Sequence, residues 1–341
     1  MTKASGGMRT RAVVVSAIAG STVLALALGA SASAVVRSDN SRIAGRVRNS
    51  GDALWVAVSP NGKTAYATTY DFNSLDVIDL KTMKRVRSTS PGAFLTGISV
   101  SKDGRKLFVG AGEGAGSATD DRTMTVLSAS SAKVIARVPY CESPAGNAIS
   151  PNGKVLYQTC SYGDSVSKLD TATNKMIGEV LVGQAPVDVA ISPDGNTAYT
   201  ANSGSNTVSV IDTRTGRETA TIAVAHDPSA VAVSPDGTRL YVACDKAFSV
   251  WVINTADQQV VGKVKVPGLA LSVAISPDGS RLYVGTMGVT VVDTASLTAL
   301  GTISVQTQKV PDLALLPGAT QLVAVAGEFT YVVDVAGYSG S

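Results

Sequence analysis

The sequence has one histidine, three cysteines and 5% aromatic residues in a chain of 341 residues. The three cysteines do not have the spacing of a metal-binding motif. A single histidine can hardly supply the axial ligands of a haem, and neither a nucleophile elbow nor a serine triad pattern accompanies it. These scarcities argue against thiolate-metal, haem and serine-hydrolase chemistry.

Charged residues are also few, at 16% of the chain, and the formal net charge is +3. The whole excess lies in residues 1–34, which contain Lys3, Arg9 and Arg11 and no acidic residue. The remaining chain has 26 basic and 26 acidic residues and is formally neutral. Because domains that bind nucleic acid are usually basic, the composition gives no support for a nucleic-acid partner.

Residues 1–34 are interpreted as a secretory signal peptide. The basic start is followed by an apolar stretch from Ala12 to Ala30 and by Ala32-Ser33-Ala34, which offers a small-residue cleavage site. The alternative is an uncleaved anchor, because an apolar stretch of this length just suffices to span a bilayer. Thr10 separates the two arginines, so the twin-arginine route is not supported. We expect a secreted or cell-surface domain with no other membrane contact.

A tetrapeptide resembling Ser-Pro-Asp-Gly recurs at a nearly constant interval. Successive starts lie 42, 49, 42, 42, 42 and 40 residues apart. A repeat of about 40 residues with four short strands is typical of a propeller blade. The sequence therefore predicts one all-β domain over residues 35–341, a seven-bladed β-propeller of four-stranded antiparallel blades. The starts are Ser59, Ser101, Ser150, Ser192, Ser234, Ser276 and a degenerate copy at Leu316-Pro317-Gly318.

The fourth repeat illustrates the expected strands. Val187 to Ile191 precedes the Ser192 turn, and three more strands follow it, at Ala198 to Ala201, Val208 to Ile211 and Glu218 to Val224. Proline fixes φ at the second turn position, and glycine accepts positive φ at the fourth. Each blade should thus begin with a tight hairpin.

Two other repeated positions are interpreted as scaffold. An aromatic side chain seven residues after the turn serine is expected to wedge between blades, because it recurs at a fixed repeat position. An Asp or Asn after the third strand is expected to cap its own turn rather than to act in catalysis. The aromatic residues are Tyr66, Phe108, Tyr157, Tyr199, Tyr241 and Tyr283, and the caps are Asp79, Asp170, Asp212, Asn254 and Asp293.

Part of the fourth repeat resembles a known family. Tyr199-Thr200-Ala201-Asn202, followed by the segment from Ser203 to Asp212, is similar to the consensus of the YVTN β-propeller repeat. The likeness extends over nearly all of residues 35–341 and is poorest in the seventh repeat. The family occurs in archaeal surface-layer proteins and in many secreted bacterial proteins. The resemblance implies a secreted propeller, but a shared propeller fold does not assign a function.

The ring is expected to close through the N-terminal segment. Only seven residues follow Asp334, too few for the fourth strand of the last blade. The segment from Arg42 to Arg48 matches fourth strands such as Val260 to Val264. If it completes the last blade, neither terminus leaves an open sheet edge.

The cysteines suggest one disulfide in an exported chain. The hairpin around Ser150 to Gly153 brings Cys160 close to Cys141, so these two are the candidate pair. Cys244 occupies the repeat position of Cys160 two blades away and is expected to be a buried thiol. The alternative is that no disulfide forms.

Candidate ligand-binding residues are those that break the repeat near the mouth of the ring. Four residues before the turn, most blades have small side chains, but Trp55, Asp188 and Asp312 depart from this pattern. Asn147 and His226 are the other candidates. Asp188 and Asp312 lie in opposite blades, and their carboxylates suit Ca²⁺ or Mg²⁺. The alternative is that both carboxylates are hydrated.

The glycine-rich segment from Gly110 to Arg122 holds the extra residues of the 49-residue step. It is either a lid or calcium-binding loop, or a flexible hairpin tip; it is no phosphate loop, because no helix follows it.

Two classes of function follow. The first is a monomeric binding scaffold for a protein, a cell-wall component or a small molecule. The second is a propeller enzyme of the lactonase or lyase type with a divalent metal in the channel.

Overall fold

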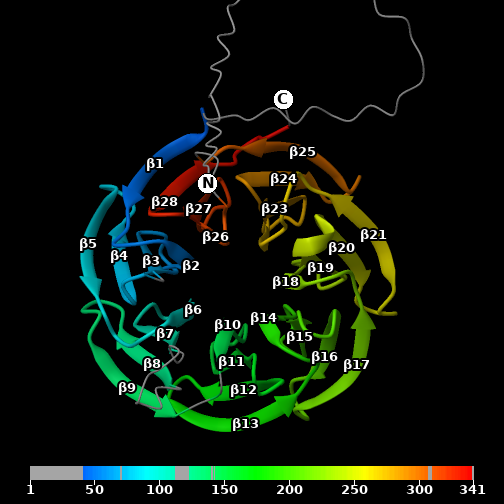
Figure 1. Cartoon of the computed structure of the whole chain (residues 1–341), viewed down its shortest axis with the longest axis horizontal. Helices are drawn as coiled ribbons and strands as arrows, with labels where there is room; N and C mark the ends of the chain where they lie inside the picture. The colour runs from blue at the N-terminus through cyan, green and yellow to red at the C-terminus, as the bar shows by residue number, and fades with distance from the viewer. Residues whose placement is uncertain are drawn as a thin grey trace, which may run out of the picture. The chain divides into compact units, whose positions relative to one another are not determined.

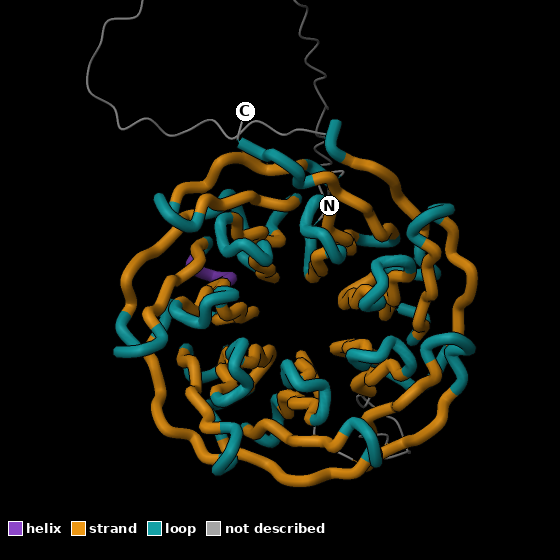
Figure 2. The backbone as a smooth tube through the Cα atoms, turned by 180° about the vertical axis from the view of Figure 1, so that it is seen from behind, coloured by secondary structure: helices purple, strands orange, loops and turns teal. Residues whose placement is uncertain are grey.

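The computed structural model describes residues 41–69, 71–111, 123–139, 141, 143–305 and 309–339. These residues form seven four-stranded antiparallel sheets, arranged as blades of a ring (Figure 1). One edge strand of each sheet lies nearest the ring axis, and the opposite edge strand lies on the rim, as the labels of Figure 1 and the view from behind in Figure 2 show. The predicted seven-bladed propeller is confirmed.

The strands of blades 1 to 4 follow the chain in order. Blade 1 has β2 (Ala53–Val58), β3 (Thr64–Thr69), β4 (Ser74–Asp79) and β5 (Lys84–Thr89). Blade 2 has β6 (Leu95–Val100), β7 (Lys106–Ala111), β8 (Thr123–Ser128) and β9 (Val134–Pro139). Blade 3 has β10 (Pro144–Ile149), β11 (Val155–Cys160), β12 (Ser165–Asp170) and β13 (Lys175–Leu181). Blade 4 has β14 (Pro186–Ile191), β15 (Thr197–Asn202), β16 (Thr207–Asp212) and β17 (Arg217–Ala223).

Blades 5 and 6 continue this order, and blade 7 combines both ends of the domain. Blade 5 has β18 (Pro228–Val233), β19 (Arg239–Cys244), β20 (Ser249–Asn254) and β21 (Val260–Lys265), with the short 3₁₀ turn η1 (Asp245–Ala247) after β19. Blade 6 has β22 (Ser272–Ile275), β23 (Arg281–Gly285), β24 (Val289–Asp293) and β25 (Thr298–Ile303). Blade 7 has β26 (Asp312–Leu315), β27 (Gln321–Ala326), β28 (Phe329–Asp334) and β1 (Ile43–Arg48).

The N-terminal strand closes the ring, as predicted. β1 pairs antiparallel with β28, and Val47 opposite Thr330 marks the register. Arg48 also forms an ion pair with Glu328 at 2.7 Å. Because the strand from the start of the domain fills the outer position of the last blade, blade 7 has four strands like its neighbours.

The repeated turn is held by its serine hydroxyl. In blade 5, Ser234 Oγ accepts the N–H of Arg239 at 2.9 Å and donates to the carboxylate of Asp236. That carboxylate also accepts the N–H of Thr238 at 3.0 Å. In blade 1, Asn61 does the same with its side-chain oxygen. In these turns the side chain of the residue after proline is therefore a structural acceptor.

The repeated aromatic residues are wedges between blades, as predicted. Tyr241 of blade 5 is 2% exposed and packs with Leu282 and Val284 of blade 6. Phe108 of blade 2 packs in the same way with Leu156 of blade 3. The predicted turn caps are also confirmed: the side chains of Asp79, Asp170, Asp212, Asn254 and Asp293 accept backbone N–H groups of their own turns.

Candidate functional site

The cavity at the mouth of the ring is built from the starts of the innermost strands. Its volume is ≈ 330 Å³. It lies at the end of the blades opposite the Ser-Pro-Asp-Gly turns, where the chain enters each innermost strand. We call it the mouth cavity; its walls are formed by Leu54, Trp55, Ala145, Val187, Ser203, Asp227, Pro228, Ser229, Asp245, Leu271 and Pro311.

One repeat position supplies most of these walls. It lies five residues before the turn serine or its equivalent, and six of the seven blades contribute it to the cavity: Leu54, Ala145, Val187, Ser229, Leu271 and Pro311. A β-bulge in the innermost strand explains why the side chain at this position faces the cavity. In β14 the pairing passes from Pro186 opposite Asn202 to Asp188 opposite Ala201, so Val187 is an extra residue in a β-bulge. A bulge redirects the side chain of the extra residue.

This position lies one residue before the one that the sequence pattern singled out, which contains Trp55, Asp188 and Asp312. Strict alternation along a strand would direct every second side chain to one face, and a bulge shifts that alternation. The available signal was chemical variety, because the six lining residues include leucine, alanine, valine, serine and proline. Among the five predicted ligand residues, Trp55 lines the mouth cavity.

Asp188 and Asp312 each join two blades. Asp188 Oδ2 accepts the N–H of Val231 in the next blade at 3.0 Å. Asp312 Oδ2 accepts the N–H of Val56 across the closure of the ring at 2.8 Å. Both carboxyl groups thus have a defined partner within the fold.

Both side chains are half-buried, and loss of hydration changes the acidity of both groups. Desolvation raises the pKa of Asp188 to about 7, although the N–H groups of Val231 and Val189 favour its ionised form. Desolvation raises the pKa of Asp312 to about 8, and the charge of Asp188 adds to this increase. Each side chain therefore exchanges its proton near neutral pH.

In blades 2 and 3, the repeat position of Asp188 and Asp312 is occupied by Gly97 and Gly146, where the neighbouring blade leaves no room for a side chain. A Cβ atom on Gly97 would lie 2.4 Å from the carbonyl oxygen of Ala145. A Cβ atom on Gly146 would lie 2.7 Å from Asp188 Oδ1. Asn147 joins blades 2 and 3 here, because its Nδ2 donates to the carbonyl oxygen of Gly97 at 2.8 Å. The predicted residue Asn147 thus contacts the neighbouring blade.

His226 is exposed and does not line the mouth cavity. Of the glycine-rich segment, residues 112–122 lie outside the described residues, as does the signal-peptide prediction for residues 1–34. Within the described residues, no group of three or more His, Cys, Asp and Glu side chains is placed to hold a metal ion. The Asp188 and Asp312 pair stays a prediction as a Ca²⁺ or Mg²⁺ site.

Two carboxylates that are not among the predicted ligand residues line the mouth cavity. Asp227 precedes β18, and Asp245 follows β19. Asp227 forms an ion pair with Lys246 at 3.1 Å. Burial raises the pKa of Asp245, and the charge of Asp227 adds to this effect. Comparison of each loop residue with its counterparts in the other repeats would have found both.

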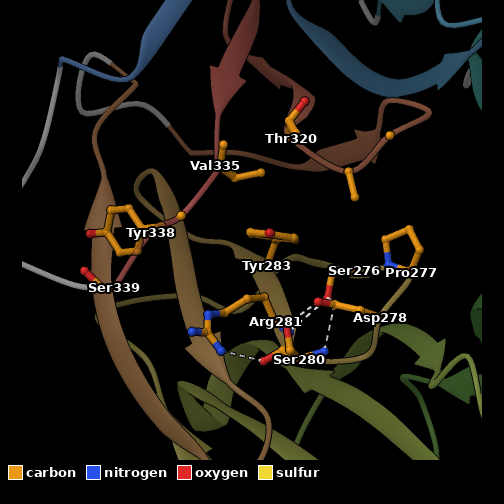
Figure 3. A pocket seen from close by; sticks show the side chains of 14 residues that line it. Ser276, Pro277, Asp278, Ser280, Arg281, Tyr283, Thr320, Val335, Tyr338 and Ser339 are labelled. Carbon is orange, nitrogen blue, oxygen red and sulfur yellow. Dashed lines mark hydrogen bonds between the residues drawn. The ribbon is translucent and has the colours of Figure 1, made fainter.

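A larger cleft lies between blades 6 and 7 at the turn end (Figure 3). Its volume is ≈ 680 Å³, and Arg281, Tyr283 and Tyr338 are among the residues that line it. Arg281 is paired with Asp293 at 2.7 Å. Equivalent turn residues line a cleft of ≈ 490 Å³ between blades 5 and 6. The turn residues that line both clefts therefore belong to the repeated scaffold.

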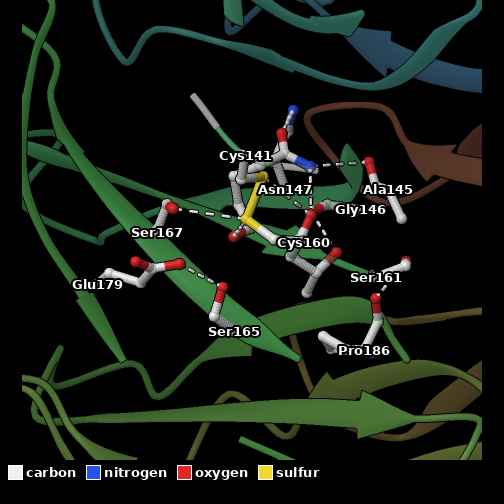
Figure 4. The surroundings of a disulfide bond; sticks show 12 residues. Cys141, Ala145, Gly146, Asn147, Cys160, Ser161, Ser165, Ser167, Glu179 and Pro186 are labelled. Carbon is white, nitrogen blue, oxygen red and sulfur yellow. Dashed lines mark hydrogen bonds between the residues drawn. A yellow bond between two sulfur atoms is a disulfide. The ribbon is translucent and has the colours of Figure 1, made fainter. Parts of the chain in front are cut away.

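Cys141 and Cys160 form a disulfide within blade 3, with Cα atoms 5.5 Å apart (Figure 4). The bond ties the segment before β10 to the end of β11. Next to it, Ser161 Oγ donates to the carbonyl oxygen of Pro186 in blade 4 at 2.7 Å. Cys244 is a buried free thiol, and burial raises its pKa to about 12.

Comparison with known proteins supports the fold and leaves the family open. No protein-family model matches the chain, and no curated protein is significantly similar to it. A chain in the solved structure of Kuenenia stuttgartiensis hydrazine synthase is similar, with a TM-score of 0.75 and 21% identity over 90% of this chain and 99% of that chain. Within the described residues, no helix has the length and apolar character needed to cross a membrane. The chain is a seven-bladed β-propeller, and at this identity the likeness concerns the fold alone.

Proposed function

We propose that this protein is an exported, monomeric binding module whose ligand occupies the mouth cavity and undergoes no reaction there. The observation that carries the proposal is the contrast between cavities. The clefts at the turn end share side chains that recur from blade to blade, such as Ser276 and Tyr283 and their counterparts Ser234 and Tyr241. The mouth cavity is lined at one repeat position by residues that differ in size and polarity. Apolar concave sites with a few polar groups are typical of ligand binding.

Export is supported by two features that are independent of each other. Residues 1–34 have the basic, apolar and small-residue segments of a signal peptide. The disulfide between Cys141 and Cys160 suits an oxidising compartment. We expect protein secreted by a bacterial host to begin at Val35 in N-terminal sequencing. Membrane-bound protein that still begins at Met1 would support the uncleaved anchor instead.

Binding at the mouth is testable with an uncharged aromatic probe, N-phenyl-1-naphthylamine. The chain has two tryptophans, and Trp251 is stacked beneath Lys263, so Trp251→Phe makes Trp55 the sole tryptophan reporter. We expect a saturable change in Trp55 emission as the probe is added. Val187→Phe fills the cavity and should weaken probe binding by at least about tenfold, roughly 1.4 kcal/mol.

Thr320→Phe is the matched control, because it adds the same ring to the larger cleft at the turn end. It should leave the binding curve unchanged. The mouth cavity is not the binding site if the probe causes no saturable change in Trp55 emission. The same conclusion follows if Val187→Phe and Thr320→Phe weaken probe binding equally.

A further inference from the structure

The mouth cavity has an apolar side and an acidic side. The apolar side is formed by Trp55, Leu54, Leu271 and Pro311, which enter from blades 1, 6 and 7. The acidic side is formed by Asp227 and Asp245, which both belong to blade 5. A ligand that fills the cavity must therefore contact apolar groups and carboxylates together.

Asp245 stands where blades 3 and 4 have a serine that acts as a hydrogen-bond donor. Ser161 and Ser203 occupy the equivalent position, eleven residues after the turn serine. Their hydroxyls donate to backbone carbonyls, at 2.7 Å to Pro186 and 3.1 Å to Ala185. An ionised aspartate has no proton to donate. Asp245 thus lacks a contact that the equivalent serines of blades 3 and 4 make.

The carboxylate of Asp245 is left with unmet acceptor capacity. Its Oδ1 atom is buried, and it has no hydrogen-bond partner in the part of the chain that the structure describes. A buried acceptor without a partner costs free energy, and a buried charge costs more. Lys309 and Lys246 favour the ionised form of Asp245, but Asp227 opposes it. A positively charged donor on the ligand would supply what the protein lacks here.

The carboxylate of Asp227 is also not needed for the local backbone conformation. Its backbone adopts a positive φ of 59°, and its N–H bonds to Asn206. Phe94 and Ala185 stand at the equivalent position of other blades with φ of 45° and 48°. The backbone geometry therefore recurs without the carboxylate. The Lys246 side chain that pairs with Asp227 is 72% exposed, so the pair is screened by water and leaves Asp227 able to interact with a ligand.

The apolar side distinguishes an organic cation from a metal ion. Hard metal ions prefer several oxygen ligands, whereas Trp55 and the aliphatic walls offer none. An ammonium group attached to an apolar body would bury that body against the walls, and it would approach the carboxylates with its charge. Aromatic rings such as that of tryptophan also attract organic cations.

Resting on the proposed function, we propose that the mouth cavity binds a small organic cation, with its ammonium group at Asp227 and Asp245 and its apolar body against Trp55, Leu54 and Leu271.

Three probes with one apolar body test this assignment: hexylammonium, hexanol and hexanoate. Trp55 emission of the Trp251→Phe protein reports binding. We expect hexylammonium to bind at least about tenfold more tightly than hexanol, and hexanoate to bind most weakly. The double variant Asp227→Ala and Asp245→Ser gives blade 5 the residues that blade 4 has at these positions, so it should fold normally. In this variant the ratio of the hexylammonium and hexanol affinities should fall to near one.

Asp52→Ala is the control, because Asp52 occupies the repeat position of Asp227 in blade 1 and does not line the cavity. It removes one negative charge outside the cavity, whereas the double variant removes two inside it, and it should preserve the preference for hexylammonium. Equal binding of hexylammonium and hexanol, or a preference that survives in the double variant, would overturn the cation assignment. If N-phenyl-1-naphthylamine still binds in that case, the proposed binding function stands; if no probe binds, both proposals fail.

Discussion

The two ends of the blades hold carboxyl groups of opposite character. At the turn end, Asp236 and Asp278 accept a serine hydroxyl and a backbone N–H, and these bonds hold their pKa values below the ordinary range, to about 2 for Asp278. On the innermost strands, burial raises the pKa values of Asp188 and Asp312 to about 7 and about 8. The repeated carboxylates favour the ionised form, and the unrepeated ones favour the protonated form.

This difference gives the two sets opposite effects on stability. A carboxyl group with a lowered pKa in the fold stabilises it above the unfolded pKa of about 4, and this contribution is lost as the pH falls through the folded pKa. A group with a raised pKa stabilises the fold fully below about pH 4, and this contribution is lost as the pH rises through the folded pKa. The turn end therefore accounts for loss of stability in acid, and the innermost strands account for loss on approaching pH 8.

The largest expected effect comes from removing the raised groups. In the double variant Asp188→Asn and Asp312→Asn, each amide oxygen retains an acceptor for the N–H of the next blade. Between about pH 4 and the folded pKa, each wild-type aspartate should lower the free energy of unfolding by about 1.4 kcal/mol per pH unit. Urea denaturation at pH 5, 6, 7 and 8 should show this decline in the wild type and a flatter profile in the variant.

Asp257→Asn is the control for this experiment, because Asp257 is an exposed aspartate in the hairpin between β20 and β21. Its profile should follow the wild type. If the double variant loses stability in parallel with the wild type over the whole range, the two aspartates do not have the raised pKa values on which this prediction rests.

The scaffold was predictable because its signals repeat. A turn such as Ser192-Pro193-Asp194-Gly195 states its backbone geometry locally, and six near copies at regular intervals fix the number of blades. The closing strand β1 followed from counting strands, since blade 7 would otherwise have three. The wedge aromatics followed from their fixed position, and the close approach of blades explains why small residues such as Gly97 accompany them.

The mouth cavity was less predictable because it depends on backbone irregularity. The bulge at Val187 moves a side chain that simple alternation would place elsewhere. Sequence reasoning chose Asp188, one residue later, whose carboxylate binds the N–H of Val231. Asp245 takes the place of Ser161 and Ser203 in the connection that follows the second strand of the blade. No hydrophobic periodicity marks that connection, so the change of residue is inconspicuous in the sequence. Trp55 was found because an indole at a position of small residues is conspicuous in the sequence alone.

A smaller effect is expected at the turn end. Blades 1 and 3 already have asparagine in the turn, where Asn61 and Asn152 accept the same serine hydroxyl and N–H contacts. Replacing the aspartate by asparagine in the other four turns should therefore preserve these hydrogen bonds. Because the side chains are exposed and screened, each replacement should change the free energy of unfolding by less than about 1 kcal/mol at pH 7. The four positions are Asp103, Asp194, Asp236 and Asp278.

Stability at low pH separates the contribution of the turn carboxylates from a general loss of charge. As the pH falls from about 4 to about 2, the wild type should lose the stabilisation of all four turn carboxylates, and the quadruple variant should retain more of its neutral stability. The hairpin caps, such as Asp212, also have lowered pKa values and should cause the remaining decline. Thermal unfolding at pH 3 and pH 7 measures both proteins. Equal losses on acidification would mean that the turn carboxylates gain nothing from ionisation, and the contrast between the two ends of the ring would then rest on Asp188 and Asp312 alone.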